Sequence, residues 1–133
     1  MDTATAQSFL DENFAPWVLA LGPKVTQVSD EGAVLEIPIT PDIARAGNIV
    51  SGQTLATLAD TAMVIACGAA NGEMVPVGTV TLDTQFLRPG SGERIEARAV
   101  VTRMGRSMAF ARCDLIAHPS GKPVATATAT FAR

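Results

Sequence analysis

The sequence has few residues of the kinds that bind metals or form disulfides, with a single histidine and two cysteines among 133 residues. Cys67 and Cys113 stand among apolar neighbours, so we expect them to be small hydrophobic fillers and not a disulfide pair or metal ligands. His118 precedes Pro119 in a predicted turn, and no other metal-binding residues stand near it in the sequence. We therefore expect no metal site, and a reducing cytoplasm as the natural compartment.

Charge is also scarce, since only 17% of the residues are charged and the net charge is −3. Such a balance argues against a nucleic-acid-binding surface. The charges are unevenly distributed: eight acids and two bases occur up to Asp60, and eight bases and five acids follow it. The basic second part suits a small phosphorylated ligand.

No charged segment followed by a hydrophobic signal core opens the sequence, and the most apolar stretch is interrupted by Asp60 and by threonines. Neither export nor a membrane-spanning helix is expected. No tandem repeat, low-complexity tract or linker divides the chain. With 47% hydrophobic residues and this length, residues 1–133 are expected to form a single globular domain.

The stretch at residues 48–70 predicts a long central helix. Ser51 is a good N-cap, Gly52 opens the first turn, and Asn71-Gly72 supply a stop signal. Asp60 is the only charge in this helix. Because a buried carboxylate without a partner costs several kcal/mol, Asp60 is either a functional group or a hydrogen-bonded structural one, and function is favoured.

The flanking segments predict an α+β fold. Residues 1–22 form an N-terminal helical segment, a lid or flanking helix capped by Thr3 or Thr5. A hairpin at 25–40 and an irregular connection at 41–47 lead to the central helix. Four successive antiparallel strands with period-two alternation follow, and in the first of them Thr79 shares a side with Thr81, opposite Val80. Small side chains, mostly alanine, let a curved sheet wrap the helix closely, and the free sheet edges favour a symmetric dimer.

Three motifs carry a resemblance to a known family: Val50–Ala62, Thr79–Pro89 with its Phe-Leu-Arg-Pro ending, and Arg103-Met-Gly-Arg106. Together with the order of elements they resemble hotdog-fold acyl-CoA thioesterases of the phenylacetate-degradation (PaaI) type, in the 4-hydroxybenzoyl-CoA thioesterase superfamily, over about Val34 to Phe131. The resemblance implies hydrolysis of a small or medium acyl- or aryl-CoA thioester. It also implies coenzyme A as part of the substrate with no other cofactor, and a site shared between subunits of a dimer or a dimer of dimers.

Residue by residue, the resemblance implies that the Gly52 N–H polarises the thioester carbonyl, that Asp60 is the catalytic carboxylate and that Thr79 assists the acid or its water. Two further positions of the motif, Ser51 and Gln53, depart from the family pattern, which has His and a second Gly there. The chemistry also follows without the family, because a helix N-terminus can stabilise an oxyanion and a buried acid can activate water or attack directly.

The remaining candidates concern substrate binding and oligomeric state. Gly52 and Asp60 are separated by about 12 Å along one helix, so a single carbonyl can use both only if a second copy lends one of them. Arg45 stands where the family often has Asn, and Asn48 is near enough in sequence to take that place. Three arginines near predicted turns are candidate contacts for the CoA phosphates: Arg88, Arg103 and Arg106.

Two alternative functions stay open on the sequence. The departures at Ser51, Gln53 and Arg45 raise a non-catalytic acyl-CoA-binding protein. A hotdog hydratase or dehydratase is weaker, because the related families pair an acid with a histidine and His118 is remote from the helix in sequence. Release of free thiol would separate the hydrolase from the binding protein.

Overall fold

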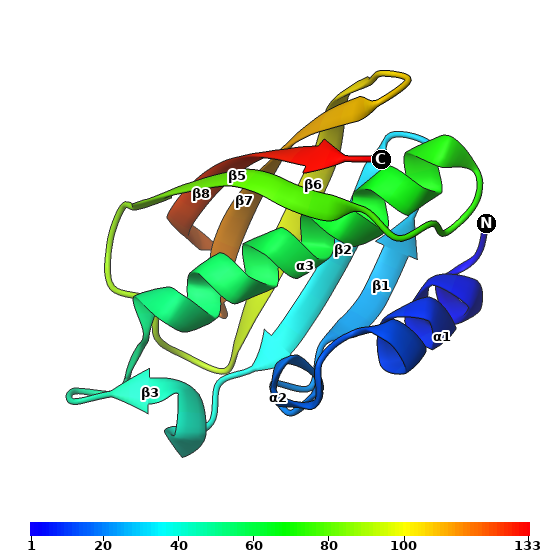
Figure 1. Ribbon diagram of the computed structural model, residues 1–133. Helices are drawn as coiled ribbons and strands as arrows, with labels where there is room; N and C mark the ends of the chain where they lie inside the picture. Colours follow the sequence, from blue (N-terminus) through cyan, green and yellow to red (C-terminus); the bar gives the residue numbers. More distant parts are fainter.

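A six-stranded antiparallel sheet wraps one long helix in the computed structural model, which describes residues 1–133 (Figure 1). The helix, α3, spans Gly52–Asn71. The strands are β1 (Lys24–Val28), β2 (Gly32–Pro38), β5 (Gly78–Phe86), β6 (Arg94–Met104), β7 (Met108–His118) and β8 (Lys122–Ala132). The predicted α+β architecture, a curved antiparallel sheet around a central helix, is therefore confirmed.

The strand order differs from the order along the chain. The sheet runs β1-β2-β6-β7-β8-β5, so β5 pairs with β8 at one edge and β6 pairs with β2 of the N-terminal hairpin. The expected succession of four neighbouring strands was thus wrong for the first of them. Period-two alternation identifies strands but does not specify their partners, and β5 lies at an edge with both faces largely exposed.

The central helix begins four residues later than the predicted 48–70. Ile49–Val50 (β4) pair with Ala44–Arg45 (β3), and a short 3-10 turn at Pro41–Ile43 precedes them, so the expected irregular connection contains a small hairpin. Ser51 is the N-cap, as predicted, and its Oγ accepts a hydrogen bond from the N–H of Thr54. Gly72 ends the helix with a left-handed conformation (φ 77°), which glycine adopts without strain.

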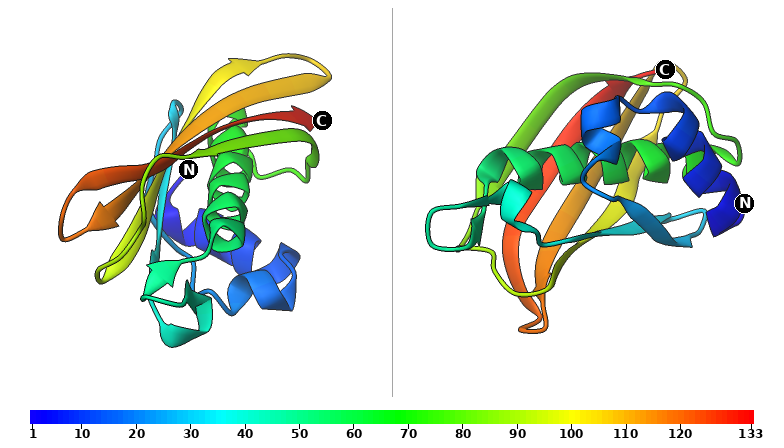
Figure 2. Two further views of the ribbon diagram at one scale, coloured as in Figure 1. Left: turned by 90° about the vertical axis from the view of Figure 1, so that its left-hand side faces the viewer. Right: turned by 90° about the horizontal axis from the view of Figure 1, so that it is seen from below.

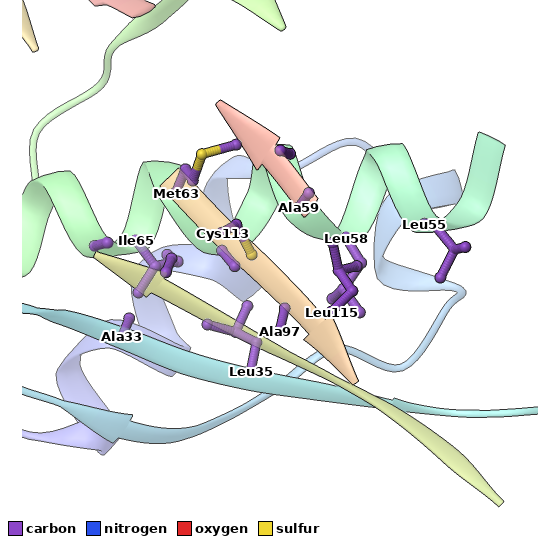
Figure 3. Close-up of a cluster of buried hydrophobic side chains, with 14 of the residues drawn as sticks. Ala33, Leu35, Leu55, Leu58, Ala59, Met63, Ile65, Ala97, Cys113 and Leu115 are labelled. Carbon is purple, nitrogen blue, oxygen red and sulfur yellow. The ribbon is translucent and has the colours of Figure 1, made fainter. Parts of the chain in front are cut away.

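The core lies between α3 and the concave face of the sheet (Figure 3). Alternate residues of β6, β7 and β8 turn inward, and most of them are alanines: Ala97, Ala99, Ala109, Ala111, Ala117, Ala125, Ala127 and Ala129. Their small side chains let the helix approach the sheet while larger residues such as Leu58, Ile65 and Leu115 fill the layer. Cys67 and Cys113 are free and buried, as expected of small fillers. α3 is the only helix long and apolar enough to cross a membrane, and most of it is buried in this core.

The N-terminal segment folds as α1 (Thr3–Asn13) and α2 (Pro16–Leu19), with α1 beside α3 along the β1 side of the sheet (Figure 2). Asp2, and not Thr3 or Thr5, is the N-cap, because its carboxylate accepts from the N–H of Thr5. Ala6 and Leu10 are fully buried. Gln7 fixes α1 to the sheet: its amide nitrogen donates to the carbonyl of Pro23, and its amide oxygen accepts from the N–H of Val25.

Close pairing of β2 with β6 generates the first testable prediction. A Cβ added at Gly32 would overlap the backbone carbonyl of Ala99, whereas one added at Gly78 would meet nothing. Gly32→Ala is therefore expected to lower the free energy of unfolding by at least about 2 kcal/mol, since an overpacked backbone must shift. Gly78→Ala serves as the matched control and should change stability by less than about 0.5 kcal/mol. Urea unfolding of both variants measures the difference, and equal stabilities would contradict the tight pairing.

Candidate active site

Asp60 lies on α3, half-buried beside the start of β5. Burial raises the pKa of its carboxyl above the ordinary value, and the hydrogen bond from Thr79 opposes this by a smaller amount. The Thr79 hydroxyl donates to Asp60 Oδ1 at 2.9 Å. The carboxylate is thus a stronger base than one in water and is held in one orientation, as acid–base catalysis requires.

A β-bulge brings Thr79 to Asp60. Thr79 pairs with the buried Phe131, and Thr81 pairs with Thr130, so the register shifts between them and Val80 is the extra residue. With unbroken alternation Thr79 would share the outward side with Thr81, as the sequence predicted. The bulge turns Thr79 inward instead, which is a common use of bulges beside functional sites.

Asp60 and Thr79 open into a groove of about 230 Å³. Its apolar lining comes from three parts of the chain: the end of α1, the turn of α3 after Asp60, and the segment before β5. The lining residues are Phe9, Asn13, Phe14, Val64, Pro76 and Val77. Apart from Asp60 and Thr79, none of these was identified from the sequence, because the groove depends on α1 packing beside α3. Only the apolar spacing of the N-terminal segment hinted at it.

The N-terminus of α3 presents two unpaired donors. The N–H of Thr54 is bonded to Ser51 Oγ and that of Leu55 to the Ser51 carbonyl, whereas the N–H groups of Gly52 and Gln53 have no acceptor. No acidic residue stands in the first turn to neutralise the positive end of the helix dipole. The arrangement suits an oxyanion, as free helix N-termini generally do. The hydroxyl of Ser51 is bonded to Thr54 and belongs to the cap.

A second hollow, of about 370 Å³, lies beside the start of α3. Gly52 and two of the predicted arginines, Arg45 and Arg88, line it together with Phe86. A Cβ at Gly52 would lie 3.2 Å from Cζ of Phe86, so a larger residue would crowd this space. Asn48 lies in the turn between β3 and β4, close in sequence to Arg45 and Ile49 of the hollow. It is exposed and has a φ of 60°.

The other two candidate arginines, Arg103 and Arg106, do not line this hollow. Arg103 and Arg106 belong to the β6–β7 hairpin, which Arg133 ties to the C-terminal end of α3 by bonding the carbonyl of Gly105 and the side chain of Asn71. They therefore lie at the end of the helix opposite Arg45 and Arg88 (Figure 1).

His118 lies 3.5 Å from Glu96 across the sheet and is half-buried, whereas the sequence suggested a surface turn. No three side chains of His, Cys, Asp or Glu form a set that could hold a metal ion.

Comparison with known proteins places these features in a family. Residues 47–124, more than half of the chain, match the sequence model of the thioesterase superfamily. The medium/long-chain acyl-CoA thioesterase YigI of Escherichia coli K12 is 28% identical over 131 residues, which cover 87% of this chain and 84% of YigI.

Two solved structures share the fold. A thioesterase family protein from Silicibacter pomeroyi superposes with a TM-score of 0.85 at 24% identity, covering 96% of this chain and 94% of that one. The Escherichia coli PaaI protein of the phenylacetic acid degradation operon superposes with a TM-score of 0.79 at 23% identity, covering 98% and 95%. The hotdog fold and the predicted class of enzyme, a thioester hydrolase, are thereby confirmed, and the chain belongs to the thioesterase superfamily.

Proposed function

We propose that this protein hydrolyses small or medium acyl- or aryl-CoA thioesters at a site shared by two copies of the chain. The observation that carries the proposal is the partly desolvated carboxylate of Asp60, held by Thr79 at the side of an apolar groove. The Escherichia coli relative, described as an acyl-CoA thioesterase, supports a CoA thioester as the substrate.

The residues supply the two functions that thioester hydrolysis needs. The N–H groups of Gly52 and Gln53 stabilise the carbonyl oxygen as it becomes negative. Asp60 either accepts a proton from the water that attacks the carbonyl carbon or attacks that carbon itself, forming an anhydride that water then opens. In both routes the C–S bond breaks, the thiolate leaves and takes up a proton, and the acyl group departs as a carboxylic acid.

A second copy is needed to complete the site. Asp60 lies eight residues, or about 12 Å, along α3 from Gly52, so one carbonyl cannot reach both groups on the same helix. Strand β5 also has a free edge of nine residues with exposed Val80 (55%) and Leu82 (38%). Long apolar edges are normally paired or covered. Two-fold pairing along β5 would cover this edge and bring the helix start of one copy beside Asp60 of the other.

The arginines have a binding role in this proposal. Arg45 and Arg88 line the hollow at the helix start, where a nucleotide phosphate can be held while the thioester reaches Gly52. Arg103 and Arg106 can contribute only if the assembly brings the β6–β7 hairpin of one copy near this hollow. A hydratase gains no support from the geometry, because His118 contacts Glu96 of the sheet and not Asp60.

Replacing Asp60 by Asn is expected to lower kcat at least about a hundredfold, because an amide can neither accept a proton at neutral pH nor attack a carbonyl. The fold should persist. The raised pKa means that folding favours the protonated carboxyl, so the stability from this group is present at low pH and is lost as pH rises through the folded-state pKa. The variant should therefore melt no lower than the parent at neutral pH. Thiol release and thermal melting on one preparation test both points, and near-native turnover would remove Asp60 from the mechanism.

Mixed dimers test the shared site. Gly52→Val places side-chain atoms against Phe86 at the oxyanion position, and Asp60→Asn removes the acid, so each variant alone should be inactive. A heterodimer of the two contains one site with both groups intact and should show about half the native turnover. Differently tagged chains, co-expressed and purified in tandem, provide the sample. An inactive heterodimer would show instead that each site lies within one subunit.

The Thr79–Asp60 hydrogen bond predicts a shift in the pH profile. This bond lowers the pKa of Asp60, so Thr79→Val should let the pKa rise further and should move the acidic limb of kcat/KM to higher pH. Thr81→Val, on the opposite side of the same strand, is the control and should leave the limb in place. An unchanged limb in both variants would mean that another group governs the acid side of the profile.

A further inference from the structure

The groove beside Asp60 is bounded by aromatic rings that come from the N-terminal helix. Phe9 of α1 and Phe14, just after it, stand edge to face with ring centroids 6.4 Å apart and an interplanar angle of 81°. Both rings are partly buried against the core and line the groove. Such an arrangement is favourable for aromatic pairs and gives a firm apolar wall.

The wall is fixed in position by contacts of α1 with the sheet. Leu10 is fully buried, and the side chain of Gln7 bonds the backbone on both sides of Lys24, at Pro23 and Val25. Asn13, at the rim, donates its amide to the carbonyl of Phe9. The end of α1 is thus held against the core.

Two other residues of the groove lining are also apolar. Val64 stands one helical turn beyond Asp60, and Val77 precedes the strand that carries Thr79. A group attached to a carbonyl at Asp60 would therefore lie among hydrocarbon side chains. The volume of about 230 Å³ limits its size. A comparable apolar cavity of about 150 Å³ holds benzene, so by proportion this groove has space for about nine carbon atoms.

We propose that Phe9 and Phe14 form the end wall of the acyl-binding groove and set the largest acyl group that the enzyme accepts. This inference rests on the proposed function, because it takes the carbonyl to lie at Asp60. Both phenylalanines determine specificity and take no part in the chemical step. Gln7 is a positioning residue that holds their helix in place.

Chain-length profiles test the proposal. With straight-chain substrates from acetyl- to palmitoyl-CoA, KM should fall about fourfold for each methylene that enters the groove and should stop falling near octanoyl. In Phe14→Ala the removed ring leaves room for longer chains, so the ratio of kcat/KM for myristoyl over octanoyl should rise at least about tenfold. Phe110→Ala, the same change on the outer face of the sheet, is the matched control and should leave the ratio unchanged.

A filling variant guards against loss of packing in Phe14→Ala. Val77→Phe adds bulk to another part of the groove lining and should move the break in the profile to shorter chains. Thermal melting of all three variants accompanies the assays. If the parent protein releases thiol and neither groove variant moves the break, the proposal is wrong and the hydrolase function stands.

Binding of S-alkyl-CoA thioethers, which cannot be hydrolysed, tests the role of Phe9 and Phe14 separately from hydrolysis. Their dissociation constants, measured by calorimetry, should show the same break and the same opposite shifts in the two groove variants. If the parent protein releases no thiol from any substrate, the proposed function is wrong. The dissociation constants still test whether Phe9 and Phe14 limit the length of the bound acyl group. If the dissociation constants stop falling at the same chain length in the parent and in both groove variants, the proposed role of Phe9 and Phe14 is wrong.

Discussion

Close contact between α3 and an alanine-rich sheet is the constraint on which the rest of the structure depends. Small residues on β6, β7 and β8 let the sheet curve around the helix, so one long side of α3 is removed from water. Asp60 lies where that burial is incomplete, and its carboxylate is partly desolvated. With larger inner residues the helix would stand further out, and the same carboxylate would be an ordinary solvated acid.

Local sequence signals predicted much of this fold because they act locally. Alternation in β2, β6, β7 and β8 identified the inward residues, and Ser51 and Gly72 mark the ends of α3 by capping chemistry that involves only neighbours along the chain. Strand order could not be obtained in this way. The pairing of β5 with β8 depends on where the chain returns after crossing the helix, and no period in the sequence records that path.

The site residues predicted from the sequence were also those with local signals, whereas residues that meet only in the folded protein were missed. Asp60 was conspicuous as a single charge in an apolar helix, and Gly52 was marked by the cap that precedes it. Phe9, Phe14 and Val77 were missed because they line a groove formed by three segments that meet only in the folded protein. The arginines were grouped by their shared position near turns, but the turns lie at opposite ends of α3. Residue type indicated the chemistry, whereas only the packing indicated which residues share a space.

The bulge in β5 changes which residues of this strand face the core. After the bulge the odd-numbered residues, such as Asp83 and Gln85, face outward. Thr79 also has an odd number but faces inward, because Val80 is unpaired. Residues 72–77, between the end of α3 and the start of β5, lie outside the ladder, so removal of one of them would shorten a loop and leave the ladder intact. Removal of Val80 would likewise keep every pair of the strand, with Thr79 still opposite the inward Phe131. If Val80 instead entered the ladder as a paired residue, Thr79 would shift by one position and turn outward. The side that Thr79 faces is therefore set by its pairing with Phe131 and not by its distance along the chain from Thr81.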